Sequence, residues 1–424
     1  MGSVQPWPTM WRVRQQFGGS PVTDLPAATR AALAELDLAG RVRPGMRVVL
    51  TAGSRGIRDV VPVLAAAIAE LRRLGAEPLV VPAMGSHGGA SAEGQAALLA
   101  GYGVTESALG APVVSQPEVV ELGQTAGGVP LFADRLAAEA DRLLVVNRVK
   151  PHTDFVGELE SGPNKMLALG LGKWHSARAC HSWFCLRGYD AVLREVGAAL
   201  WAKLPVLGGL GLVENGHQQT VRVGALRPGQ EQADEAGLLA EARAVFGYLP
   251  FERLHVLLLD WLGKDISGSG MDPNVTGADV CRLHSRRERP FIWRIGVRGL
   301  TAASAGNATG LGQADYALRR CVEAVDWPAT YTNTVAAASP EGARCPVTFD
   351  NDQQLLAAAF STSGPEPAAA KRLVWARDTL AVDDLLVSEA LVEEARAHPA
   401  VISVAPWAPG LVFDDQGLLD SPWR

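Results

Sequence analysis

The chain has 424 residues, of which 48% are hydrophobic and 20% charged, so a disordered chain is excluded and two or more separately cored domains are expected. Its formal charge of −6, its pI near 5.8 and the lack of a long basic run argue against general nucleic-acid binding, because neutralising phosphates requires clustered Lys and Arg. The five cysteines form no CxxC pair and are odd in number, which favours reduced thiols over a disulfide framework.

The N-terminal stretch MGSVQPWPTMWRVRQQFGG has no apolar signal-peptide core. Nothing elsewhere approaches the ~20 uninterrupted apolar residues that span a bilayer. We therefore expect a cytoplasmic protein without membrane or nucleic-acid partners.

The first elements in the chain alternate between strand and helix. Residues 46–53 read as a buried strand, 58–76 as an amphipathic helix and 77–89 as a strand that ends in glycines. A helix near 91–103 and a strand at 141–149 continue the alternation. This pattern predicts an α/β fold with a mostly parallel sheet covered by helices.

The stretch 150–181 has many glycines and little amphipathic periodicity, so it is predicted to be a non-repetitive loop. Beyond it, 189–204 reads as a helix, 206–215 as a strand and 232–250 as a helical segment that ends at a proline. We expect this proline to close a larger, Rossmann-like domain of residues 1–250.

Strands and helices alternate again in the second half, which predicts a smaller α/β domain of residues 251–399. Its expected elements are a strand at 254–260, a glycine-rich loop at 261–277, a strand at 291–300 and a helix at 313–327. The Pro- and Ala-rich stretch 361–372 reads as a surface loop. The tail from 400 to 424 is expected to return to the first domain.

Three polar side chains, Arg55, His87 and His152, come just after predicted strands. Open α/β sheets bind ligands at the carboxyl ends of their strands, so the three loops are expected to meet at one crevice. In TAGSRG, residues 51–56, the main-chain amides with Ser54 and Arg55 can hold a phosphate or carboxylate; a plain helix start is the alternative. Neither a GxGxxG nor a P-loop pattern is present.

The other candidate residues carry imidazole or amine groups. His87, in MGSHGG, is an acid/base candidate or a simple turn histidine. Lys165 and His181 follow His152 in the glycine-rich stretch, and His181 can equally be a surface residue. No HExxH pair or Cys/His quartet occurs, so this segment does not form a zinc site by itself. Its basic side chains and glycines instead favour a ligand site.

The order SRG, GSHGG, VKPHTDFVG, GPNKM and then His181 resembles the nickel-dependent lactate racemase family over about the first 250 residues. Members of that family use a nickel-pincer nucleotide, pyridinium-3,5-bisthiocarboxylic acid mononucleotide carrying Ni(II). The resemblance implies that Lys165 is the lysine joined to the pincer through a thioacyl group. It also implies that His181 completes the coordination of nickel.

The same resemblance implies that His87 and His152 are the two catalytic histidines, on opposite faces of a bound 2-hydroxy acid. Arg55, with Ser54 beside it, corresponds to the arginine that contacts substrate or cofactor. Inverting a carbinol carbon with an unactivated C–H is easier by hydride transfer to the pincer than by proton removal, with a histidine taking the hydroxyl proton.

Two departures from the family pattern bear on the substrate. The family's Asp-x-Thr-Arg-Pro is Ala-Gly-Ser-Arg-Gly at residues 52–56, and its His-Arg-Pro is His-Gly-Gly at residues 87–89. These smaller residues favour a bulkier 2-hydroxy acid or a sugar acid over lactate. Lys264, in the loop 261–277, is a candidate for binding the substrate carboxylate, although a lysine after a strand commonly faces solvent.

The sequence thus predicts a racemase or epimerase of a 2-hydroxy acid whose cofactor is loaded by separate biosynthesis proteins. Two alternatives remain open: net redox of the 2-hydroxy acid with the same cofactor, and a noncatalytic protein that binds an anion or nucleotide. The sequence leaves open the substrate, the covalent attachment of the cofactor and the oligomeric state.

Overall fold

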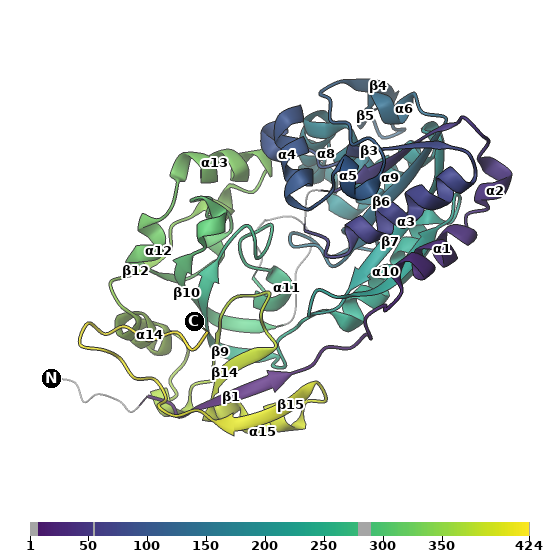
Figure 1. The fold of residues 1–424 in the computed structure, drawn as a ribbon. Coiled ribbons are helices and arrows are strands. Elements are labelled where there is room, and N and C mark those ends of the chain that lie inside the picture. The colour runs from purple at the N-terminus through teal and green to yellow at the C-terminus, as the bar shows by residue number, and fades with distance from the viewer. Residues whose placement is uncertain (1–6, 54–55, 279–289, 424) are drawn as a thin grey trace. The chain divides into compact units, whose positions relative to one another are not determined.

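The computed structural model describes residues 7–53, 56–278 and 290–423. The chain divides into two compact units (Figure 1). The N-terminal unit comprises Gly19–Phe246, and the C-terminal unit comprises Gly247 onward together with the segment that ends at Gly18. The change of unit at 246/247 lies beside the predicted boundary at 250, but the first segment of the chain belongs to the C-terminal unit.

A five-stranded sheet forms the centre of the N-terminal unit, in the order β3-β2-β6-β7-β8. Its strands are β3 (Glu77–Pro82), β2 (Arg47–Ala52), β6 (Arg142–Val149), β7 (Val206–Glu214) and β8 (Thr220–Leu226). The first four are parallel and β8 is antiparallel to β7. A separate hairpin joins β4 (Val119–Gln124) to β5 (Pro130–Asp134). The predicted α/β fold with a mostly parallel sheet is confirmed.

Helices cover both faces of this sheet. They are α1 (Leu25–Ala34), α2 (Leu38–Arg41), α3 (Val60–Arg73), α4 (Ala92–Gly101), α5 (Glu106–Leu109), α6 (Arg135–Ala138), α7 (Pro163–Lys165), α8 (Lys173–Arg187), α9 (Tyr189–Lys203) and α10 (Glu231–Val245). Apolar residues of α3 recur at helical spacing, and the face that includes Val63 and Leu64 packs in the core with Leu33 of α1. On the other face, Trp201 of α9 and Leu238 of α10 lie over glycines of β7, which leave room for them.

The sheet of the C-terminal unit has eight strands, in the order β12-β11-β10-β9-β13-β14-β1-β15. Their bounds are β12 (Val347–Phe349), β11 (Tyr316–Leu318), β10 (Phe291–Leu300), β9 (Arg253–Leu262), β13 (Leu373–Ala376), β14 (Asp384–Ser388), β1 (Met10–Gln15) and β15 (Val401–Pro406). The pairs from β12 to β13 are parallel, and those from β13 to β15 are antiparallel. This unit is also α/β, but its sheet is mixed.

The helices of the C-terminal unit are short. They are α11 (Pro273–Thr276), α12 (Arg319–Glu323), α13 (Trp327–Ala336), α14 (Asp352–Ser361) and α15 (Val392–Ala397). The single helix predicted at 313–327 is wrong. Its buried Tyr-Ala-Leu stretch instead forms β11, which pairs with β10, because backbone pairing beside a parallel neighbour outweighs a weak helical pattern.

The tail does not return to the N-terminal unit as expected. Strand β15 pairs antiparallel with β1, with Val13 opposite Val404, at the edge of the eight-stranded sheet. In Figure 1 the purple strand β1 accordingly lies between the yellow strands β14 and β15. Pairing with β15 occupies the main-chain groups that β1 would otherwise expose at the edge of the sheet.

The predicted loop at 150–181 is wrong in its second half. Helix α7 is followed by a π-helix, η2 (Met166–Leu171), and then by α8. All six residues of η2 are buried. A helix that is buried on every side has no polar face, so it shows none of the periodicity by which helices are recognised in a sequence.

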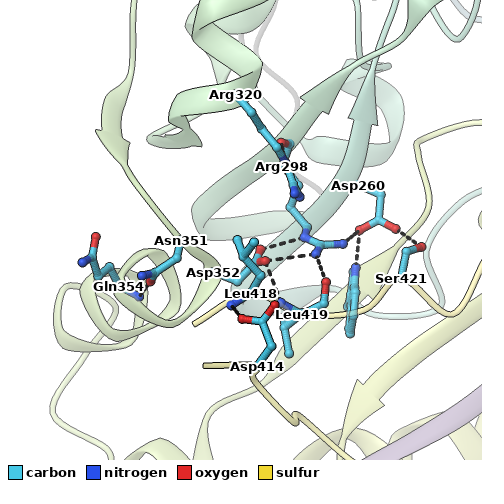
Figure 2. Close-up of polar contacts among 11 residues, drawn as sticks. Asp260, Arg298, Arg320, Asn351, Asp352, Gln354, Asp414, Leu418, Leu419 and Ser421 are labelled. Atoms are coloured by element: carbon cyan, nitrogen blue, oxygen red, sulfur yellow. Dashed lines mark hydrogen bonds and ion pairs between the residues drawn. The ribbon is translucent and has the colours of Figure 1, made fainter. Parts of the chain in front are cut away.

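A buried ionic network lies in the C-terminal unit (Figure 2). The Arg298 guanidinium lies between two carboxylates, 2.5 Å from Asp260 and 2.7 Å from Asp352. The last segment of the chain completes it, since the Leu419 carbonyl accepts from Arg298 and the Ser421 hydroxyl donates to Asp260. The network therefore fastens the tail to β9 and β10.

The thiols agree with the expectation of reduced cysteines. The four described cysteines, Cys180, Cys185, Cys321 and Cys345, are all unpaired. No helix within the described ranges is both long and apolar enough to cross a membrane.

Candidate functional site

The predicted site residues of the N-terminal unit follow three neighbouring strands. His87 follows β3 and His152 follows β6, while β2 lies between these strands in the sheet. All three are parallel, so their carboxyl ends share one edge. Ser54 and Arg55, which follow β2 in the sequence, lie outside the described residues.

The loop that carries His87 depends on glycine conformations. Gly85, Gly88 and Gly89 have φ values of 59°, 65° and 65°, where residues with a Cβ are strained. A Cβ at Gly88 would also lie 2.6 Å from the backbone of α4. The buried Gln95 amide donates to the carbonyls of Gly85 and His87, at 3.0 and 3.3 Å. The loop thus holds a half-buried His87 at the end of β3.

A buried carboxylate organises the turn after β6. One oxygen of Glu160 accepts from the main-chain N–H of His152. The other accepts from the Gly157 N–H at 3.1 Å and pairs with Arg243 of α10 at 2.5 Å. Glu160 is only 2% exposed, so this pairing also compensates its charge. Arg243 of α10 therefore helps to position the main chain of His152 through Glu160.

The two basic residues at the centre of the predicted site touch each other. The Lys165 amino group contacts Nε2 of His152. On the other side of the ring, Nδ1 of His152 accepts the main-chain N–H of Asp154 at 3.0 Å. The imidazole is 6% exposed, whereas Lys165 is half-buried. Both ring nitrogens of His152 are therefore engaged.

The residue before Lys165 is held by a second carboxylate of α10. Glu235 accepts from the main-chain and side-chain N–H groups of Asn164, at 2.8 and 2.9 Å. Complete burial raises the pKa of Glu235 to about 7, against the lowering effect of these two hydrogen bonds. A Cβ at Gly162 would lie 2.3 Å from the Glu235 carboxylate, so a larger residue there would displace this carboxylate.

The π-helix η2 begins directly after Lys165. π-Helices are rare and occur frequently at functional sites. The Gly170 carbonyl in η2 accepts from the N–H of Gly85, at 3.1 Å. The His87 loop is therefore bonded to the helical segment that follows Lys165.

An aromatic cluster links His152 to His181. The ring of Tyr189, at the start of α9, stacks on Phe155 and Phe184 with centroid distances of 4.6 and 4.0 Å. It also lies 5.9 Å from the imidazole of His152 and 6.5 Å from that of His181. Two of the predicted residues, His152 and His181, thus lie beside one ring, and Lys165 contacts the first of them.

The other lysine of this segment has a different environment. The Lys173 amino group lies 2.9 Å from the Asp134 carboxylate, and both side chains are at most 4% exposed. Asp134 also accepts from two main-chain N–H groups at the start of α6. Lys173 is thus a buried ion-pair partner, whereas Lys165 lies beside an imidazole.

Lys264 belongs to the C-terminal unit. Its amino group donates to the Gly268 carbonyl at 2.6 Å, and its N–H donates to the Ser304 hydroxyl at 2.8 Å. It therefore braces its own glycine-rich loop. A cavity of about 490 Å³ in the same unit is lined by parts of 248–252 and 394–399, and no predicted site residue lines it.

Sequence reasoning missed the residues that support this site. No local sequence pattern marks Glu160, Glu235 or Tyr189, because the sequence around a buried carboxylate or aromatic ring does not distinguish it from an exposed one. Asn164 lies within the GPNKM motif, but the motif alone predicts no role for it. Among the described residues, no group of three or more His, Cys, Asp or Glu side chains is arranged to hold a metal ion.

The N-terminal unit contains a match to a known protein family. A family model of the lactate racemase N-terminal domain matches residues 29–190, which include β2, β3, β6 and the segment from His152 to Tyr189. The structure of the lactate racemase apoprotein from Thermoanaerobacterium thermosaccharolyticum is similar, with a TM-score of 0.50 at 13% identity over 90% of this chain and 86% of that chain, and this likeness shows a shared fold.

A structural-genomics target protein from Thermotoga maritima matches with a TM-score of 0.49 at 13% identity, covering 96% of this chain and 98% of that one. No curated protein matches. Residues 29–190 are therefore similar to the lactate racemase N-terminal domain, and the chain shares its fold with the lactate racemase apoprotein.

Proposed function

We propose that the protein is a racemase or epimerase that inverts the carbinol carbon of a 2-hydroxy acid. The observation that carries the proposal is that Lys165 contacts His152, and that His152 and His181 both lie beside Tyr189. His152 follows the same edge of the sheet as the His87 loop. These contacts lie within the residues that match the lactate racemase N-terminal domain.

Two histidines suit a reaction that has to work on both faces of its substrate. Inverting a 2-hydroxy acid requires the hydroxyl proton to be taken and later returned, once for each stereoisomer. His87 and His152 follow β3 and β6, which flank β2 in the sheet. In the proposal each histidine exchanges that proton with one stereoisomer.

The residues present fit a nickel-pincer nucleotide. His181 offers a half-buried imidazole, a ligand type that suits nickel, and Lys165 offers an amine in contact with His152. Asn164 Oδ1 and Glu235 Oε1 are buried beside Lys165 without a hydrogen-bond partner in the described structure, which indicates polar capacity left in this region. When bound, the cofactor would supply the hydride acceptor that the side chains lack.

Within this proposal Lys165 is the attachment residue. Lys173 is the nearest alternative in sequence, but its amino group is committed to the buried Asp134 carboxylate. Extracting Lys173 would leave that carboxylate buried without its ion-pair partner, at a cost of several kcal/mol. We further propose that Ser54 and Arg55 bind cofactor or substrate, and that Lys264 would serve a substrate carboxylate only after leaving the Gly268 carbonyl.

The decisive experiment is co-expression with pincer-biosynthesis proteins and nickel, followed by intact-mass, peptide-mass and metal analysis. An adduct on Lys165 and about one nickel per chain are expected. Lys165→Arg should abolish the adduct, whereas Lys203→Arg, at an exposed position of α9, should retain it. A protein without nickel or adduct, under conditions that load a known racemase, would contradict the proposal.

Loaded protein should then be tested on 2-hydroxy acids deuterated at the carbinol carbon, with chiral separation of the products. Racemisation or epimerisation with retained deuterium is expected, because the same hydride is returned. Accumulation of keto acid would instead indicate net redox. Loaded protein that binds a 2-hydroxy acid without turnover, and whose binding survives His87→Ala and His152→Ala, would indicate a binding protein.

A further inference from the structure

The contact between His152 and Lys165 carries information on protonation. A neutral imidazole has one N–H donor and one acceptor nitrogen, and its hydrogen bonds reveal which is which. The main-chain N–H of Asp154 points to Nδ1 of His152 at 3.0 Å. A main-chain amide can only donate, so Nδ1 has to be the acceptor.

The proton of the ring then lies on Nε2, the atom that faces Lys165. An ammonium group has three donors and no acceptor, so it would meet this N–H donor to donor. A neutral amine has a lone pair that can accept the N–H. We propose that the main-chain amide of Asp154 fixes the tautomer of His152, and that the Nε2–H of His152 holds Lys165 as a neutral, nucleophilic amine before any cofactor is attached.

The rival arrangement has a proton on Nδ1, paired with the Asp154 carboxylate, and an ammonium group on Nε2. The distance from Nδ1 to the carboxylate is 4.0 Å, too long for a hydrogen bond, whereas the amide contact at 3.0 Å is ideal. A doubly protonated ring fails for the same reason, since its Nδ1–H would oppose the amide N–H. The geometry thus favours the neutral pair.

The surrounding charges agree with a neutral lysine. Glu160, which holds the main chain of His152, is compensated by Arg243 of α10. Glu235 of α10 lies behind Asn164 and is buried, which disfavours its ionised form. Tyr189 covers the ring of His152 from α9, and His181 of α8 lies on the same tyrosine. Among the described groups here, the Asp154 carboxylate lies 4.0 Å from Nδ1, too far for a hydrogen bond.

This gives His152 a task that precedes the one assigned to it in turnover. Attachment to an acyl carbon needs an amine lone pair: nitrogen forms the new bond, the leaving group departs with the electrons of the broken bond, and one nitrogen proton goes to the medium. The role of a neutral Lys165 in cofactor attachment rests on the proposed function, in which Lys165 carries the cofactor. The protonation state of Lys165 does not.

The test is trace acetylation of the cofactor-free protein with acetic anhydride from pH 6 to pH 9, quantified for each lysine by peptide mass spectrometry. The chain has only six lysines, so each can be followed. An ordinary lysine with a pKa of about 10.4 reacts about tenfold faster for each pH unit in this range. The exposed Lys203 should do so, whereas Lys165 should react at a nearly constant rate above pH 7, at least ~100-fold faster than Lys203 at pH 7.

Two variants locate the cause. His152→Gln can turn a carbonyl oxygen toward Lys165 and stabilise the ammonium, so the pH profile of Lys165 should become steep like that of Lys203. Asp154→Ala keeps the main-chain N–H and should leave the profile flat. A steep profile for Lys165 in the unmodified protein, or a flat one in His152→Gln, would overturn the inference.

The outcome is separable from that of the proposed function. A flat profile together with failed nickel loading would keep a neutral Lys165 and reject the pincer cofactor. An adduct on Lys165 together with a steep profile would keep the cofactor and reject the tautomer mechanism.

Discussion

Two buried polar clusters, one in each unit, differ in how completely their atoms are partnered. Around Arg298 in the C-terminal unit, the guanidinium and both carboxylates are bonded (Figure 2). Trp375 Nε1 adds a further bond to Asp260 at 2.7 Å. Around Lys165 in the N-terminal unit, Asn164 Oδ1 and Glu235 Oε1 are buried without a partner in the described structure.

This difference is the one expected between a structural cluster and the proposed site. Buried polar groups are normally satisfied, so a closed network such as that of Arg298 stabilises one conformation and has no capacity left for a ligand. The cluster at Lys165 is held by residues of α9 and α10. It keeps two buried acceptor oxygens that have no hydrogen-bond partner in the described structure. At the proposed site, these unpartnered acceptor atoms are groups that a ligand could bind.

The largest effect is expected from breaking the closed network. Arg298→Met would leave Asp260 and Asp352 buried without their cation, and should lower the free energy of unfolding by about 3–5 kcal/mol. Urea denaturation measures this. If Arg298→Met prevents folding, a sharp loss of soluble protein relative to an Arg319→Met control, at an exposed pair with Asp350, reports the same effect. Unfolding at the parent midpoint would show that the network contributes little.

The next effect comes from the open cluster and depends on pH. The pKa of Glu235 is about 7 in the folded protein and about 4.5 when unfolded, so the folded state retains a proton that the unfolded state loses. Glu235 should therefore cost no stability below about pH 4.5, and its penalty should grow until about pH 7. Glu235→Gln cannot ionise. Its free energy of unfolding, relative to that of the parent protein, should therefore rise by about 2–3 kcal/mol from pH 5 to pH 8.

Urea unfolding of Glu235→Gln and the parent protein at both pH values checks this prediction. The difference between the two proteins isolates Glu235 from other titrating groups. An equal difference at pH 5 and pH 8 would show that Glu235 is ionised throughout, and that its position behind Asn164 is a simple hydrogen-bonded one.

The sequence predicted the central strands of both units better than the helices that carry the proposed site. Strands β2, β3, β6, β7 and β9 follow apolar runs, so they were predictable, as was the meeting of the β3 and β6 loops at one edge. The helices from 163 to 187 were not, because they are surrounded by protein and carry no polar stripe.

The pairing of β1 with β15 was also unpredictable, since it joins segments almost 400 residues apart and depends on which edge of which sheet stays open. In the site, His152, Lys165 and His181 were found through motifs. Glu160, Glu235 and Tyr189 act only through tertiary contacts, so no motif marks them.

The smallest effect is expected at the tail. Ser421→Ala removes one hydrogen bond to Asp260, which keeps its bonds to Arg298 and Trp375, so the loss should be about 1 kcal/mol. Ser403→Ala, at an exposed position of β15, is a matched control and should change stability by less than about 0.5 kcal/mol. Equal urea midpoints for the two variants would mean that the tail is held by β15 alone. A lower midpoint for Ser421→Ala, together with faster proteolysis of residues 410–423, would show that the closed network also anchors the end of the chain.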